Sequence, residues 1–182
     1  MKLLGICGSL RVSSWNSRLL SLVPEFLPDD VRLDIQLIGD LPHYNADLDG
    51  ERKPAVVQSL LDRVASADAL LFVTPEYNYS IPGVLKNSID WASRPAYKSP
   101  LAHKPAGIIT ASSSQAGGVR AQTHLKQVLG GTLTPVYPAP DLALAMVSSL
   151  FDSEGRLSDN GARERLQHYL TGFVAWIRTQ TR

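Results

Sequence analysis

The chain has 182 residues, of which 44% are hydrophobic and 19% are charged, a composition typical of one globular domain of ordinary size. Its 18 lysines and arginines balance 17 aspartates and glutamates, and this net charge of +1 argues against a nucleic-acid-binding or membrane-binding surface. Because no apolar stretch reaches the ~18 residues that span a bilayer and no signal peptide precedes Gly8, we expect a soluble cytoplasmic protein.

The first half of the chain alternates strand-like and helix-like segments. Residues 3–7 form a nearly continuous apolar run, which predicts a strand buried on both faces of a parallel sheet. Apolar residues at helical spacing predict a helix over 16–27, and an alternating pattern predicts a second strand over 31–38. A second helix is predicted over 55–67, and 69–73 is the clearest buried strand of the sequence.

The second half continues the same alternation. A helix with proline in its first turn is predicted over 82–93, followed by a strand over 106–111. A helix over 119–129, a last core strand over 132–137 and a closing helix over 159–179 complete the series.

Strands that alternate with helices indicate right-handed crossovers and a parallel sheet with helices on both faces. Five strands in a chain this short favour a flavodoxin-like α/β fold, a three-layer sandwich, over a six-stranded dinucleotide fold. We expect residues 1–182 to form a single domain, with two segments long enough to be functional loops, 39–54 and 138–156.

Neither a disulfide nor a metal site is expected. The single cysteine, Cys7, cannot form an internal disulfide, and its apolar flanks favour a small buried strand residue over a reactive thiol. The four histidines have no carboxylate or cysteine at ligand spacing: His43, His103, His124 and His168.

Three polar loops follow the carboxyl ends of apolar strands, the edge at which open parallel sheets bind ligands. They are GSLRVSSWN (8–16), PEYNYSIPG (75–83) and ASSSQAGG (111–118). The first lacks the spacing of the two familiar glycine-rich nucleotide loops. Its serines, asparagine and arginine, with the N–H groups that open a helix, nevertheless predict a phosphate site. The alternative is an ordinary capped helix.

The second and third loops suit a planar heterocycle. Tyr77 and Tyr79 offer flat surfaces with polar tips on a stiff, proline-bounded backbone, although they could instead pack onto neighbouring helices. In the third loop, Gly117 and Gly118 allow backbone to approach a ligand closely, although a flexible turn would use the same residues.

Together, GSLRVSSWN, PEYNYSIPGVLKNSIDW and, more weakly, TASSSQAGG resemble the NAD(P)H-dependent FMN reductase family, flavodoxin-like flavoproteins that include quinone, chromate and azo-dye reductases. The resemblance implies that the FMN phosphate is held by Ser9, Arg11, Ser14 and Asn16. It implies that the isoalloxazine ring and ribityl chain are lined, largely through backbone atoms, by Pro75, Glu76, Tyr77, Asn78 and Tyr79, and that the ring is approached by Ser112. Where some relatives have glycine, this chain has Ser13, and residues 113–115 have no assigned role.

The activity implied by the resemblance is an FMN-dependent oxidoreductase. NADPH or NADH would deliver hydride to the flavin and leave, and a quinone or similar small acceptor would then bind in place of the nicotinamide. This scheme predicts ping-pong kinetics and needs no obligatory catalytic side chain. Two alternatives remain: a flavodoxin-type electron carrier, which would usually be strongly acidic, and a flavin-based redox sensor.

The resemblance also implies a homodimer or homotetramer with the flavin near a subunit interface. The exposed apolar candidates for such an interface are Trp91 and residues 150–151. Lys86 and Asp90, four residues apart on a predicted helix, are expected to form an exposed pair rather than a catalytic one.

Overall fold

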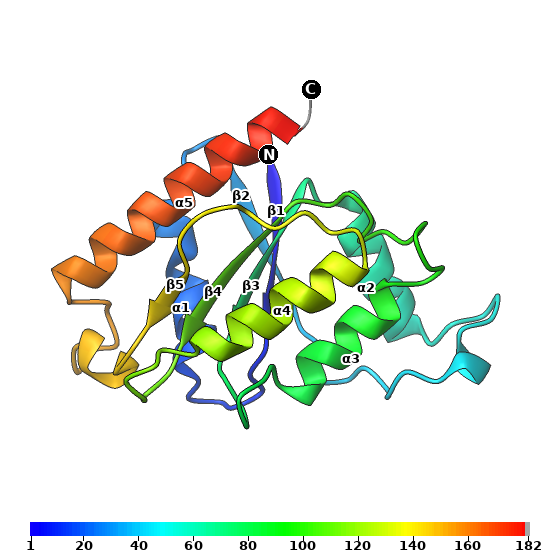
Figure 1. Cartoon of the computed structure of the whole chain (residues 1–182), viewed down its shortest axis with the longest axis horizontal. Helices are drawn as coiled ribbons and strands as arrows, with labels where there is room; N and C mark the ends of the chain where they lie inside the picture. Colours follow the sequence, from blue (N-terminus) through cyan, green and yellow to red (C-terminus); the bar gives the residue numbers. More distant parts are fainter. Residues whose placement is uncertain (181–182) are drawn as a thin grey trace.

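Five parallel strands form one sheet in the computed structural model, which describes residues 1–180 (Figure 1). The strands are β1 (Lys2–Cys7), β2 (Arg32–Gln36), β3 (Ala69–Thr74), β4 (Ala106–Ala111) and β5 (Leu142–Leu144). Their order in the sheet is β2-β1-β3-β4-β5, the order of flavodoxin-like proteins, so the predicted fold class is confirmed. Every residue of β3 and β4 is buried, which explains why both strands are continuous apolar runs.

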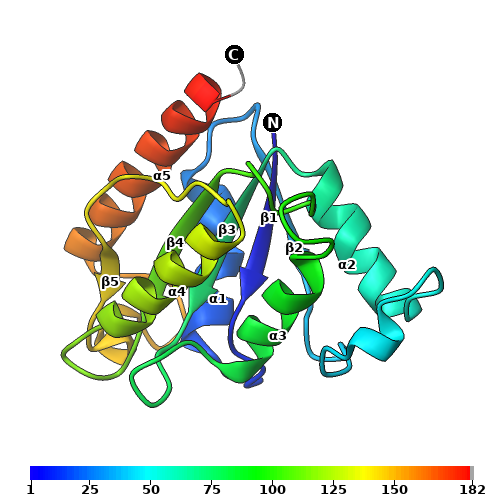
Figure 2. The ribbon, with the colours of Figure 1, turned by 45° about the vertical axis from the view of Figure 1, so that its right-hand side comes forward.

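Five α-helices cover the two faces of the sheet: α1 (Trp15–Leu22), α2 (Ala55–Ser66), α3 (Gly83–Ala92), α4 (Val119–Gly131) and α5 (Asn160–Gln180). The buried residues of α1 and α5 share one core cluster, and those of α2, α3 and α4 share the other, on the opposite face (Figure 2). None of the helices in residues 1–180 combines the length and apolar character needed to cross a membrane.

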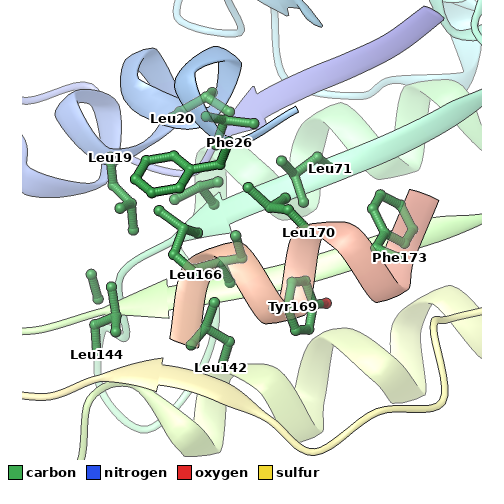
Figure 3. Packing of buried hydrophobic residues seen from close by; sticks show 14 of the residues in the cluster. Leu19, Leu20, Phe26, Leu71, Leu142, Leu144, Leu166, Tyr169, Leu170 and Phe173 are labelled. Carbon is green, nitrogen blue, oxygen red and sulfur yellow. The ribbon is translucent and has the colours of Figure 1, made fainter. Parts of the chain in front are cut away.

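The α5 face of the core shows how an amphipathic helix is fixed to the sheet. Leu166 and Leu170 of α5 point toward Leu71 of β3 and Phe26, and all four side chains are buried (Figure 3). Complete burial of an aliphatic side chain of this size contributes about 1.5–3 kcal/mol to folding. The periodic apolar residues of this helix are therefore its attachment to the sheet.

The first helix is shorter than predicted. Its α-helical part ends at Leu22, and a 3-10 helix, Val23–Phe26, completes the segment predicted over 16–27. Pro24 lacks the N–H that would continue the α-helical hydrogen bonds, so the chain tightens instead.

The prediction of a last core strand over 132–137 is wrong. In the structure Val136 makes a single bridge to Ala106, and the strand that pairs with the end of β4 is Leu142–Leu144, within a segment predicted to be a loop. The chain leaves the sheet between these two contacts. Prolines, which cannot donate to a strand ladder, flank and occupy the break: Pro135, Pro138 and Pro140.

A tyrosine from α5 compensates for this break. The backbone N–H of Ile108, between the bridge and β5, donates to the hydroxyl oxygen of Tyr169 at 2.8 Å. Both residues are buried, so this N–H has no access to bulk water. Burial also raises the pKa of Tyr169 above its ordinary value of 10, which keeps the hydroxyl neutral.

Replacing Tyr169 by Phe leaves a buried N–H unpaired, and we expect the free energy of unfolding to fall by about 1–3 kcal/mol. Urea titration at pH 7 measures this change. Above about pH 10 the tyrosine ionises in the unfolded chain before it ionises in the folded protein, so the wild type loses stability as pH rises. Y169F has no hydroxyl to ionise at this position, so it should not show this pH-dependent loss.

The matched control is Tyr137→Phe. Tyr137 packs against Tyr169, with ring centroids 5.3 Å apart, but its hydroxyl makes no hydrogen bond within residues 1–180. Equal destabilisation in Y169F and Y137F would show that the hydroxyl of Tyr169 does not replace the missing ladder contact.

Candidate functional site

The three polar loops meet at the carboxyl edge of the sheet, the lower edge in Figure 1, because the strands they follow are parallel. Between them lies a hollow of about 200 Å³. It is lined by all ten residues of the predicted cofactor site except Asn78 and Tyr79. Its lining is Ser9, Arg11, Ser14, Trp15, Asn16, Pro75, Glu76, Tyr77, Ala111, Ser112, Ser113 and Val147. We call it the flavin hollow, after the ligand that the sequence predicts for it.

The first loop presents donors at the start of α1. The Ser14 hydroxyl caps this helix by accepting the Ser17 N–H at 3.3 Å, whereas the N–H groups of Trp15 and Asn16 have no acceptor in the described part of the chain. Arg11 is exposed beside them and donates to the backbone oxygen of Ser13 at 3.1 Å. Unpaired N–H groups at a helix N-terminus beside a guanidinium suit an anion. The loop thus combines an ordinary helix cap with unpaired donors.

Asn16 has a structural contact that the sequence did not reveal. Its amide donates to the Ala111 oxygen at 3.0 Å and accepts the Ala111 N–H at 3.2 Å, and the side chain is buried. This pair joins the first turn of α1 to the end of β4. The amide is therefore used by the protein, and the backbone N–H of Asn16 is the donor left for a ligand.

The start of the loop depends on Gly8. A Cβ built on this residue would lie 2.1 Å from the Oγ1 atom of Thr74, which is fully buried at the end of β3. Only glycine permits the two strands to end this close together.

The second loop turns through a tight hairpin. Tyr77 and Ser80 exchange both backbone hydrogen bonds, each 2.9 Å long, around two residues in the left-handed region, Asn78 at φ 49° and Tyr79 at φ 64°. Tyr77 and Tyr79 are both exposed, although Tyr79 contacts the neighbouring helix α4 through Arg120, as the alternative prediction supposed. The ring of Tyr79 lies outside the flavin hollow, 4.4 Å from the guanidinium carbon of Arg120.

Glu76 connects this loop to α4. Its carboxylate accepts the backbone N–H groups of Arg120 at 3.0 Å and Ala121 at 3.3 Å, and it forms an ion pair with the Arg120 side chain at 3.3 Å. A carboxylate at the N-terminus of a helix is favoured by the unpaired N–H groups there. The Glu76 side chain thus fixes the loop, which leaves the loop backbone to line the hollow. No local sequence signal placed Arg120 beside Glu76, 44 residues away.

The third loop is held to β5. The N–H of Ser112 donates to the Leu144 oxygen at 3.0 Å, and the Ser112 hydroxyl lies 3.0 Å from that of Ser114. Gly117, at φ 61°, would place a Cβ only 3.0 Å from the backbone nitrogen of Ala145. The glycine is therefore required by close approach within the protein.

Four lining residues were not predicted as site residues: Trp15, Ala111, Ser113 and Val147. Trp15 lies within the first loop motif, and Val147 follows the strand whose position was predicted wrongly. Within residues 1–180 no three histidine, cysteine, aspartate or glutamate side chains gather as a metal site. Lys86 and Asp90 form an exposed ion pair of 2.5 Å outside the flavin hollow.

Comparison with known proteins relates this geometry to an enzyme family. The family described as NADPH-dependent FMN reductase matches residues 1–148. An NAD(P)H-dependent FMN reductase of Pseudomonas aeruginosa is 42% identical over 98% of this chain and 96% of its own length. A quinone reductase of Escherichia coli is 37% identical over 97% of this chain and 95% of its own length.

A solved structure extends the similarity to three dimensions. The flavoenzyme NAD(P)H:(acceptor) oxidoreductase of Paracoccus denitrificans superimposes with a TM-score of 0.91 and 35% identity, covering 98% of both chains.

Proposed function

This chain belongs to the NADPH-dependent FMN reductase family, and on that premise we propose that it transfers hydride from NAD(P)H, through bound FMN, to a quinone or similar small acceptor. The observation that carries the proposal is the flavin hollow, which gathers residues from three distant loops at the edge where parallel sheets bind ligands. The family match supports FMN as the cofactor, and the hollow offers a place for it.

The residues of the hollow fit FMN by their chemistry. Two buried serine hydroxyls, Ser9 and Ser14, with the Arg11 guanidinium and the unpaired N–H groups of α1, suit a phosphate. At about 200 Å³ the hollow holds only part of such a molecule, so its ring would rest on the rim formed by 76–79 and Ser112. When bound, FMN supplies the hydride chemistry itself.

The protein's own contribution is binding and orientation. Glu76, the only carboxylate that lines the hollow within residues 1–180, is bound to the N-terminus of α4 and to Arg120, so it is not assigned as an acid or base. The exposed rings of Tyr77 and Tyr79 offer flat surface beside the hollow for a planar acceptor. The assignments of individual residues to FMN, of residues 1–182 to one domain, and of the protein to the cytoplasm stay predictions.

Replacing Arg11 by Ala should weaken FMN binding about 10- to 100-fold, because a charge-assisted hydrogen bond to phosphate is worth roughly 1.5–3 kcal/mol. Riboflavin, which lacks the phosphate, should bind the variant and the wild type equally. Titration followed by flavin fluorescence measures both affinities. The control is Arg52→Ala, an exposed arginine outside the hollow. Equal losses for FMN and riboflavin would contradict a phosphate role for Arg11.

A hollow of this size serves the two substrates in turn, so we expect ping-pong kinetics. Initial rates measured at several fixed quinone concentrations should give parallel lines when the reciprocal rate is plotted against reciprocal NADPH concentration. Lines that intersect would indicate a ternary complex and would rule out a shared site.

We further propose that the protein is a homodimer or homotetramer. The predicted apolar candidates do not support this, because Trp91 is fully buried and Phe151 is only 8% exposed. Instead, a groove of about 700 Å³ between α3 and α4 has the half-buried Val128 beside the Lys86 and Asp90 charges, which could pair with those of a second copy. Light scattering should give a molar mass of two or four times the 19.8 kDa of one chain, and a molar mass of 19.8 kDa would contradict the proposal.

A further inference from the structure

A second hollow, of about 530 Å³, lies on the other side of the first loop, between α1 and the carboxyl end of β2. We call it the lateral hollow. It shares Ser9 and Arg11 with the flavin hollow, so the two cavities adjoin at the proposed phosphate site. Its volume falls within the range of about 300–1,000 Å³ found for small-molecule sites. The function proposed above leaves this cavity without a role.

Exposed apolar side chains form one part of its lining. Leu10 is 54% exposed, Leu37 is 81% exposed and Ile35 is 37% exposed. Leu10 approaches Gly39 of the loop after β2, where a Cβ would lie 3.4 Å from it, so the first loop reaches toward the β2 loop. Three aliphatic side chains left in contact with water beside a cavity suit a flat apolar group such as a nucleobase.

Polar groups of two kinds complete the lining. Arg11 is exposed and offers a guanidinium at the boundary between the two hollows. Asp40 lies four residues beyond the end of β2, and within residues 1–180 its carboxylate forms no ion pair and accepts no hydrogen bond. In the six-stranded dinucleotide-binding fold, which has another strand order than this sheet, an acidic residue accepts hydrogen bonds from the ribose hydroxyls, and the carboxylate of Asp40 has the same capacity here. The set therefore comprises a cation for phosphate, a carboxylate for ribose and aliphatic groups for a base.

We propose that the lateral hollow binds the adenosine 5′-phosphate half of a dinucleotide whose other half lies at the flavin hollow, either as the flavin of FAD or as a nicotinamide that stacks on bound FMN. The proposal rests on the function proposed above, because it takes the first loop to hold phosphate. Arg11 meets the pyrophosphate, Asp40 the ribose hydroxyls, and Leu10, Ile35 and Leu37 the adenine. Two dinucleotides carry this group: the nicotinamide substrate, and FAD bound in place of FMN.

The first test uses FMN-loaded protein and AMP as the probe, measured by equilibrium dialysis. The variant Leu37→Asp places a carboxylate beside the phosphate-bearing ligand and should weaken AMP binding about tenfold or more through like-charge repulsion. Because Leu37 is largely exposed, this variant should keep the wild-type melting temperature. The matched control is Leu48→Asp, a half-exposed leucine outside both hollows, which should bind AMP as the wild type does.

Two further arms identify the source of the adenosine. If it is FAD, protein equilibrated with equal amounts of FMN and FAD should carry a smaller share of FAD in L37D than in L48D. If it is the nicotinamide substrate, L37D should raise the KM for NADH but not for reduced nicotinamide mononucleotide, which lacks adenosine. In that case Asp40→Asn should raise the preference for NADPH over NADH, because it removes a charge that repels the 2′-phosphate.

Failure to bind AMP, or equal AMP binding in L37D and L48D, would overturn the proposal. The proposal would also be overturned if L37D weakened AMP binding but L37D and L48D had the same share of bound FAD and the same KM for NADH. The function proposed above is judged separately in the same samples. FMN affinity and flavin reduction by reduced nicotinamide mononucleotide report on the flavin hollow alone, and their loss in the wild type would refute that function instead.

Discussion

Two buried hydrogen bonds between the Asn16 amide and the backbone of Ala111 join parts of the chain 95 residues apart, and the site depends on this junction. They fix the first turn of α1 against the end of β4. Because both partners are buried, breaking the pair would leave polar groups without water, which makes the junction costly to open. The unpaired N–H groups of α1 and the loop that begins at Ser112 therefore border the same hollow.

The second loop is fixed in a similar way by a different residue. The Glu76 carboxylate holds it to the N-terminus of α4, and the Tyr79 ring lies against Arg120 of the same helix. In both loops a conspicuous polar side chain maintains the architecture, and backbone groups, with Ser9, Ser14 and Arg11 in the first loop, remain at the hollow. Such a site suits a cofactor that carries its own chemistry, since what it needs from the protein is a rigid and correctly shaped surface.

Most of the fold could be predicted from the sequence, because β3 and β4 are buried at every residue and their apolar runs are unmistakable. The last strand could not. β5 has three residues, and prolines in the preceding segment interrupt its pairing. The hydroxyl that pairs with Ile108 comes from Tyr169, 61 residues away, and no local pattern reveals such a contact. The meeting of the three loops at one edge of the sheet was predictable for a simpler reason, that polar loops follow apolar parallel strands. The contacts of Asn16 and Glu76 were not, because each joins residues distant in sequence.

The central claim is that the hollow at the carboxyl edge of the sheet binds FMN for reduction by a nicotinamide. The most direct test is the visible spectrum of the protein with FMN, recorded without oxygen before and after NADPH is added. We predict that protein-bound flavin will lose its absorption at ~450 nm, since the cofactor takes up the hydride. Bound flavin that NADPH or NADH leaves oxidised would contradict the claim, as would protein that binds no flavin at all.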